Sequence, residues 1–209
     1  MRVAGWKSTG IALGVLAGLA VFLSAVAAPP RSITSQTTRS GIQINLDPAQ
    51  SKVHYTVDTT LHTVHGTFNL KSGTMTFDPA GGKASGEVIV FATSGDSGNS
   101  SRDARMHKEI LETQKYPDAI FLPSQIEGTV AASGVSDVKV RGTINIHGSE
   151  HEVVALVHAE MASDHWKATA KFDVPYIQWG IKDPSNWFLK VKPVVNVELE
   201  MAGTAKPAN

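Results

Sequence analysis

The side chains best suited to chemistry are the eight histidines, two pairs of which have the spacings of a zinc site. His62 and His65 lie three positions apart, and His147 and His151 lie four apart. On a helix, such spacings place two imidazoles on one face, where they can bind zinc together. The residues around these histidines are typical of strands and turns, in which the same offsets do not converge. We therefore predict no metal site, and a metal-dependent hydrolase stays an alternative.

Arg102 and Asp103 are adjacent charges in a segment that predicts a helix. Neighbouring helical positions do not face one another, so the two side chains cannot act as a simple catalytic pair. We expect a structural use, with Asp103 at the start of the helix and Arg102 holding a loop or the end of a strand. If either side chain points into a cavity, it could instead hold a quinone carbonyl or a phosphate head group.

Signals for nucleophilic catalysis are absent from the sequence. It contains no Gly-x-Ser-x-Gly and no His-Glu-x-x-His motif, and it has no cysteine, which excludes thiol catalysis, thiolate metal sites and disulfides. Basic and acidic residues balance at 19 each, so no net charge recruits nucleic acid. We predict a protein that is not an enzyme and binds no nucleic acid. An esterase acting on a lipid remains the enzymatic alternative.

One amphipathic helix is predicted beyond the N-terminal region, over residues 100–113. Ser100 followed by Asp103 resembles a capping box, and Met106, Ile110 and Leu111 fall on one face. Pro117 ends the segment, because the residue before a proline is pushed out of the helical region. About three turns of helix cannot fold alone in water. We therefore expect this helix to cover one end of a β-barrel.

Most of the remaining chain alternates between apolar and polar residues, which predicts β-strands. A change of apolar phase at residues 72–73 predicts a β-bulge. The predicted fold is all-β: an extended antiparallel barrel of about eight strands with one inserted helix. The expected strands cover residues 42–46, 53–57, 66–77, 87–93, 119–122, 125–130, 138–146, 151–161, 166–174 and 188–201.

Side-chain volume on the buried face decides whether such a barrel is hollow. Gly142, Ala168 and Ala170 occupy expected inward positions, and small inward residues leave space. The alternative is a dry core, in which larger inward side chains fill that space. Those larger side chains are Phe68, Met75, Phe77, Trp166 and Phe172. The pattern by itself leaves both interiors open.

The N-terminal region is typical of a secretory signal. Arg2 and Lys7 precede an apolar run over residues 11–23, and Ala25-Val26-Ala27 forms a cleavage pattern. We interpret residues 1–27 as a signal peptide, 28–41 as a disordered lead, 42–202 as the folded domain and 203–209 as a flexible tail. The predicted location is periplasmic or secreted, with no stable membrane insertion after cleavage. An uncleaved segment would instead anchor the protein to the membrane.

Several short stretches, in one order along the chain, resemble the YceI-like family of secreted bacterial lipid-binding domains. They include Val64-His65-Gly66-Thr67-Phe68, Lys115-Tyr116-Pro117 and the run over residues 142–148, and the ordered set is more specific than any single stretch. Others lie at residues 47–51, 73–78, 102–104 and 120–121. The chain departs from the family at Ile110 and Leu111, where a pair of phenylalanines is common.

The resemblance implies a lipocalin-like barrel whose apolar tunnel holds a polyisoprenoid or a related long-chain lipid. No cofactor is expected beyond that lipid, whose head group could be a quinone, a polyprenyl phosphate or a fatty amide. Its role could be transport, storage or stress response, and a homodimer is an open alternative. A structural envelope module without a ligand is the second alternative function. The predicted lipid-binding residues are Tyr55, Phe68, Met75, Phe77, Val90, Met106, Ile110, Ile144, Phe172 and Trp187.

Overall fold

The computed structural model describes residues 41–208. The expected signal peptide, and all but the last residue of the expected lead, therefore lie outside the described residues. Within the described part, no helix is long and apolar enough to cross a membrane.

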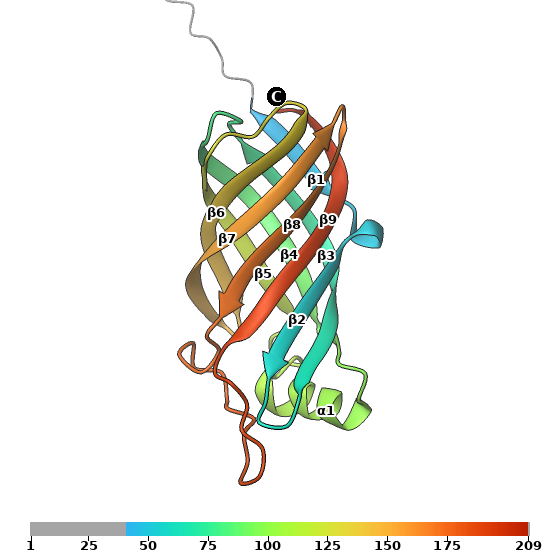
Figure 1. The fold of residues 1–209 in the computed structure, drawn as a ribbon, viewed down its shortest axis with the longest axis vertical. Coiled ribbons are helices and arrows are strands. Elements are labelled where there is room, and N and C mark those ends of the chain that lie inside the picture. The colour runs from blue at the N-terminus through green and yellow to red at the C-terminus, as the bar shows by residue number, and fades with distance from the viewer. Residues whose placement is uncertain (1–40, 209) are drawn as a thin grey trace, which may run out of the picture. The chain divides into compact units, whose positions relative to one another are not determined.

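The described residues form one closed antiparallel β-barrel (Figure 1). Consecutive strands from β2 to β9 pair along the chain, including β8 and β9 on either side of the long connection, and β9 then pairs with β1 and β2 to close the cylinder. The strands are β1 (Ile42–Leu46), β2 (Lys52–Asp58), β3 (Thr63–Phe77), β4 (Gly82–Asp96), β5 (Asp118–Glu127), β6 (Gly134–Ile146), β7 (Ser149–Ala162), β8 (His165–Val174) and β9 (Val195–Pro207).

Strands β1 and β2 share one position in the barrel wall, because both pair with β3 on one side and β9 on the other. The short 3-10 turn η1 (Pro48–Gln50) separates them, and the Asp47 side chain accepts a hydrogen bond from the Ala49 N–H. The chain does not reverse its direction at η1, since β1 and β2 both run antiparallel to β3 and β9. Nine strands in the described chain therefore build an eight-position barrel.

The alternating pattern places apolar side chains inside the barrel, as predicted. In β6, Val138 and Val140 are buried, whereas Lys139 and Arg141 are exposed. The predicted bulge in β3 is confirmed, since the pairing of β3 with β4 shifts register between Leu70 and Ser72. A second shift lies between Thr67 and Asn69. Bulges bend a long strand, as closure of a barrel requires.

Several strand boundaries differ from those expected, and two of the predictions need correction. Residues 119–122 and 125–130 were predicted as separate strands, but β5 runs through Pro123 as one strand, with a register shift that absorbs the proline. The last strand was expected over residues 188–201 and instead begins at Val195 and ends at Pro207. The expected flexible tail is therefore corrected for residues 203–207. These residues pair with β1, a partner too distant in sequence for local pattern to reveal.

The helical segment is shorter and less regular than predicted. It comprises the α-helix α1 (Ser100–Arg105) and the π-helical turn η2 (Met106–Ile110). The N-cap is Asn99, whose side chain accepts from the Arg102 N–H, so the expected cap at Ser100 is wrong. Asp103 does not complete a capping box either, because it accepts from the backbone N–H and the hydroxyl of Ser97.

Four connections gather at the end of the barrel where β2, β4, β6 and β8 finish, which we call the lid end (Figure 1). They are the loop 59–62, the helical segment after β4, the turn at residues 147–148, and the long segment 175–194, which we call the strap. The strap contains no regular helix or strand, although residues 188–194 were predicted to belong to the last strand. The helical segment lies at one end of the barrel, as expected.

Candidate binding cavity

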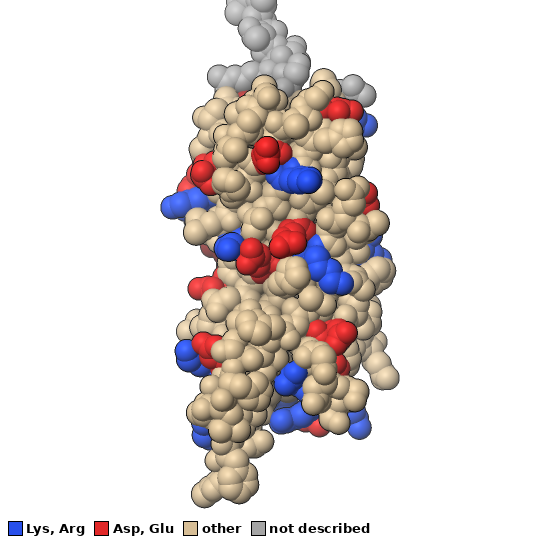
Figure 2. All heavy atoms as spheres, turned by 45° about the vertical axis from the view of Figure 1, so that its right-hand side comes forward, with Lys and Arg blue, Asp and Glu red and all other residues tan. Residues whose placement is uncertain are grey.

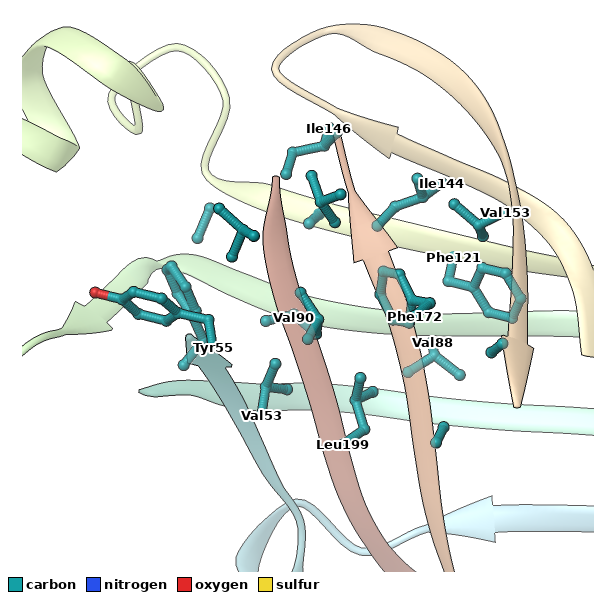
Figure 3. A pocket seen from close by; sticks show the side chains of 18 of the residues that line it. Val53, Tyr55, Val88, Val90, Phe121, Ile144, Ile146, Val153, Phe172 and Leu199 are labelled. Carbon is teal, nitrogen blue, oxygen red and sulfur yellow. The ribbon is translucent and has the colours of Figure 1, made fainter. Parts of the chain in front are cut away.

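A cavity of about 630 Å³ occupies the interior of the barrel. Its wall is built from alternate side chains of the strands, because every second residue of a strand faces inward. Figure 3 shows Val53, Val88, Phe121, Phe172 and Leu199 projecting into this space from different strands. The volume lies within the range of roughly 300–1,000 Å³ that is usual for small-molecule sites.

The interior is hollow rather than solid. The buried apolar side chains keep between 4% and 9% of their surface exposed, and no large side chain in the described chain falls below 2%. In a close-packed core, large side chains interdigitate and leave few voids. Most of these buried side chains line the cavity, among them Met75, Phe77 and Trp166. The dry-core alternative is therefore wrong, because these large residues border the space without filling it.

Two of the three small inward residues leave space, as expected. Ala168 and Ala170 are buried in β8 and line the cavity. Gly142 has a different role, because a Cβ atom at this position would lie 2.6 Å from the ring of Phe121. Phe121 lines the cavity in its place. Sequence alone could not show this, since β5 must pair with β6 before the ring covers the glycine.

Nine of the ten predicted lipid-binding residues lie together on the cavity wall. The exception is Trp187, which is 90% exposed and does not line the cavity. Contact with a ligand stays a prediction for the nine. They are Tyr55, Phe68, Met75, Phe77, Val90, Met106, Ile110, Ile144 and Phe172.

Sequence reasoning missed further lining residues. Val53 alternates in phase with Tyr55 in β2, so the strand pattern indicates its inward face. Leu199 lies in β9, a strand in which no lipid-binding residue was predicted. Pro184, Leu189 and Val191 come from the strap, which has no periodicity to indicate an inward face.

The polar residues of the cavity wall are concentrated at the lid end. Thr59 and His62 come from the loop after β2, and Ser101, Arg102 and Arg105 come from α1. The Nε of Arg105 lies 3.6 Å from the Glu109 carboxylate. The far end of the cavity is bordered by apolar side chains such as Ile126, Val130 and Trp166. The cavity is therefore amphipathic along its length.

Arg102 holds the chain before the helix, as predicted. Its Nε donates to the Ser97 hydroxyl at 2.7 Å, and its Nη2 donates to the Ser97 carbonyl at 2.8 Å. Asp103 accepts from the Ser97 N–H at 3.0 Å. These contacts fasten the end of β4 to α1, and Arg102 also borders the cavity.

Tyr176 carries a buried polar atom with no partner among the described residues. The residue is 5% exposed and lines the cavity, and its hydroxyl makes no hydrogen bond there. Burial, together with the nearby charge of Asp183, raises the pKa of Tyr176 to about 12. The hydroxyl therefore stays protonated and can donate a hydrogen bond to a ligand. Buried hydroxyls are normally paired, so this one marks a polar contact point in the cavity.

The four histidines with metal-like spacing are dispersed. His65 contacts the Thr56 hydroxyl at 3.1 Å, His147 lies 2.9 Å from the Glu112 carboxylate, and the His151 ring stacks on Trp179 at 4.3 Å. Only His62 borders the cavity. Within residues 41–208, no group of three or more His, Asp or Glu residues is placed to hold a metal ion.

Comparison with known proteins agrees with this architecture. A search of curated proteins found no match. Among solved structures, a polyisoprenoid-binding domain from Saccharophagus degradans is 15% identical, with a TM-score of 0.63 over 78% of this chain and 98% of its own. BcnA of Burkholderia cenocepacia is 18% identical, with a TM-score of 0.62 over 76% of this chain and 99% of its own. The YCEI protein of Campylobacter jejuni is 20% identical, with a TM-score of 0.54 over 68% of this chain and 85% of its own.

These structural matches show a shared fold. The family model of the YceI-like domain matches residues 45–203, which is most of the chain and all but the ends of the barrel. The protein belongs to the YceI-like family.

Proposed function

We propose that this protein binds and carries an amphiphilic isoprenoid-type lipid, with the tail in the barrel and the polar head at the lid end. The observation that carries the proposal is the amphipathic cavity, which is apolar along the strands and polar where α1 and the loop 59–62 meet it. The solved domain from Saccharophagus degradans, described as polyisoprenoid-binding, supports this class of ligand.

An apolar lipid tail binds by burial in an enclosed apolar cavity and needs no precisely placed hydrogen-bond donors. Burying about 400 Å² of tail surface at about 25 cal/mol/Å² contributes on the order of 10 kcal/mol before the costs of ordering. That is enough for micromolar or tighter binding once several kcal/mol of ordering cost are subtracted.

The polar groups at the lid end suit a head group. The Tyr176 hydroxyl can donate to a carbonyl or phosphate oxygen, and its burial strengthens such a bond. Arg102 and Arg105 border the same space, so a negatively charged or strongly accepting head is electrostatically favoured there.

We infer a role in binding rather than catalysis. An esterase needs a nucleophile whose proton is taken by a neighbouring base. Among the described residues, Ser101 is the serine on the cavity wall, and no hydrogen bond joins its hydroxyl to a histidine ring. The signal-like N-terminal sequence supports a periplasmic or secreted location for this carrier.

The direct test is mass spectrometry of the protein purified from its native envelope without detergent. We expect a co-purifying prenyl or acyl lipid in stoichiometric amount. Screening the same sample with chromogenic esters tests the enzymatic alternative, and steady turnover would contradict a purely binding role.

The substitution Ala170→Phe tests whether the cavity itself holds the lipid. Ala170 lines the cavity, so a phenyl ring there occupies the space of the tail. We expect a loss of at least about tenfold in bound lipid, since displaced tail surface costs about 25 cal/mol/Å². Lys171→Phe is the matched control, because Lys171 is the next residue of β8 and is exposed on the outer wall. Circular dichroism verifies that both variants fold, and equal lipid content in the two would refute binding in the barrel.

A further inference from the structure

The largest exposed apolar side chains gather at the lid end. Trp187 is 90% exposed and Phe188 87% exposed in the strap, and Leu61 is 73% exposed in the loop 59–62. The strap projects beyond the barrel (Figure 1), and Figure 2 shows an uncharged surface at the end of this projection. We call Leu61, Trp187 and Phe188 the apolar tip.

The apolar tip is held outward by a defined turn. The Asn186 side chain accepts hydrogen bonds from the N–H groups of Phe188 at 2.9 Å and Leu189 at 2.8 Å. The Asn186 N–H in turn donates to the Leu189 carbonyl at 2.8 Å. These bonds fix the backbone at both aromatic residues, so their exposure is a feature of the folded turn.

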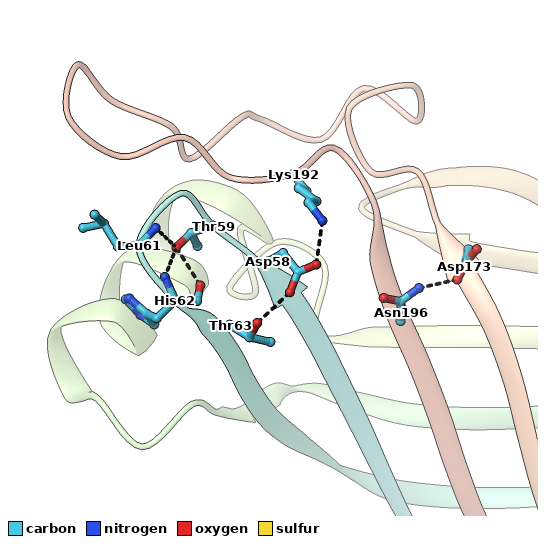
Figure 4. A network of polar contacts seen from close by, with 8 residues as sticks. All are labelled: Asp58, Thr59, Leu61, His62, Thr63, Asp173, Lys192 and Asn196. Atoms are coloured by element: carbon cyan, nitrogen blue, oxygen red, sulfur yellow. Dashed lines mark hydrogen bonds and ion pairs between the residues drawn. The ribbon is translucent and has the colours of Figure 1, made fainter.

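The strap is also fastened to the loop that carries Leu61. The Thr60 N–H donates to the Lys190 carbonyl at 2.9 Å, and the Lys192 ammonium lies 2.8 Å from the Asp58 carboxylate (Figure 4). Within the loop, the Thr59 hydroxyl accepts from the N–H groups of Leu61 and His62. Two segments far apart in sequence therefore present their apolar side chains at one end of the molecule.

Three lysines lie next to the tip, at positions 182, 190 and 192. Lys182 and Lys192 pair with Glu109 and Asp58, and Lys190 lies near Asp183, so the local charges balance. Lysines beside an apolar tip can reach lipid phosphates while their stems stay in apolar surroundings.

We propose that the apolar tip docks the lid end onto a phospholipid bilayer, so that the cavity opens toward the membrane. The inference rests on the proposed function, since a lipid carrier must collect its cargo from a membrane. Leu189 and Val191, beside the tip, line the cavity, so the strap connects the docking surface to the cavity wall.

A bilayer suits the tip better than a second protein chain does. A stable protein interface buries roughly 800 Å² on each partner over a matched surface. The tip offers two aromatic side chains on a projecting turn and Leu61 on the loop 59–62, a surface too small and too convex for such an interface. A bilayer interface deforms around a small projection, and tryptophan favours its head-group region.

Vesicle flotation of the full mature chain tests the docking. The vesicles are phosphatidylcholine alone, and phosphatidylcholine with one quarter phosphatidylglycerol. We expect Trp187→Ala combined with Phe188→Ala to lower vesicle binding by about tenfold or more, because binding to an interface scales with inserted apolar area. Val135→Ala is the control, since Val135 is 56% exposed at the start of β6, at the end of the barrel opposite the lid end. Its vesicle binding should equal that of the wild type.

Fluorescence with brominated lipids tests the depth of the tip. We expect quenching of the wild type that is reduced in Trp187→Phe, a variant that keeps an aromatic side chain and should retain flotation. Equal flotation of the double variant and the wild type would overturn the proposal. So would a wild-type dimer, seen by analytical ultracentrifugation, that the double variant abolishes, because the tip would then bind a second copy. If the purified barrel contains lipid but does not bind vesicles, only the docking proposal is refuted. If an empty barrel binds vesicles, only the proposed lipid carriage is refuted.

Discussion

At the scale of single residues, small side chains in this barrel have opposite effects that depend on their neighbours. Ala168 and Ala170 leave space inside, whereas the space beside Gly142 is taken by Phe121. Gly66 is similar, because a Cβ atom there would lie 2.4 Å from the ring of Tyr55 on the paired strand. A small residue therefore marks space that either a ligand or another side chain can take.

The residue-scale prediction concerns the Tyr176 hydroxyl. In Tyr176→Phe, we expect lipid with a polar head to bind about three- to tenfold more weakly, because a hydrogen bond has a net value of about 0.5–1.5 kcal/mol. A lipid with the same tail but an apolar head should bind equally to both proteins. Competition with a fluorescent fatty probe measures both affinities. Tyr116→Phe is the control, since Tyr116 packs against His147 and does not line the cavity. An equal loss of affinity for both lipids would mean that the Tyr176 hydroxyl does not bind the head group.

At the scale of elements, the helical segment depends on its caps and on its attachment to β4 rather than on its own length. A six-residue α-helix followed by a π-helical turn cannot be stable alone. Asn99 caps its start, and Arg102 and Asp103 both bind Ser97. This segment covers the lid end because the preceding strand holds it there.

The element-scale prediction compares Asn99 with Ser100. Asn99→Ala removes the side chain that accepts from the Arg102 N–H, and we expect a local loss of about 1 kcal/mol. Native-state hydrogen exchange should then be faster for the amides of α1 and unchanged in β6 and β7. Ser100→Ala is the control, because Ser100 is the cap that local sequence favours but not the cap that forms. Faster exchange in Ser100→Ala and none in Asn99→Ala would contradict this assignment.

At the scale of the whole molecule, ion pairs between distant segments position the strap over the lid end. The hydrogen bond from Lys192, aided by Thr63, lowers the pKa of Asp58, and the hydrogen bond from Lys182 lowers the pKa of Glu109. Both carboxylates are exposed, so each pair has a small value alone. Their common effect is to hold the strap, and with it the apolar tip, in one place.

The molecule-scale prediction is a loss of strap order in acid. A carboxylate whose pKa is lowered by folding stabilises the fold at pH values above its ordinary pKa, and this contribution is lost as the pH falls through the lowered value. We therefore expect the strap to loosen below about pH 4, the ordinary range for Asp and Glu. Faster hydrogen exchange at the Thr60 and Lys192 amides, which donate to the Lys190 and Asp58 carbonyls, should report this change before the barrel unfolds. In Asp58→Asn the change should be smaller, and an acid response identical to that of the wild type would exclude the Asp58–Lys192 pair as its cause.

The sequence by itself determined the fold class, the bulge in β3 and most of the inward-facing residues. Strand periodicity is a local property, so Val138 and Val140 indicate their buried face without knowledge of their partners. Seven of the nine predicted residues on the cavity wall lie in strands, from Tyr55 in β2 to Phe172 in β8, whereas Met106 and Ile110 lie on the apolar face of the helical segment.

Tertiary structure alone decided the features that depend on contacts between distant segments. The pairing of residues 203–207 with β1, the filling of the space beside Gly142, and the outward position of Trp187 each depend on such contacts. An aromatic side chain in an irregular segment has no periodic neighbours to indicate its direction, and the bonds of Asn186 and Thr60 set that direction here. The hollow interior also belongs to this class, because an unfilled volume is a property of the closed barrel and of no single strand.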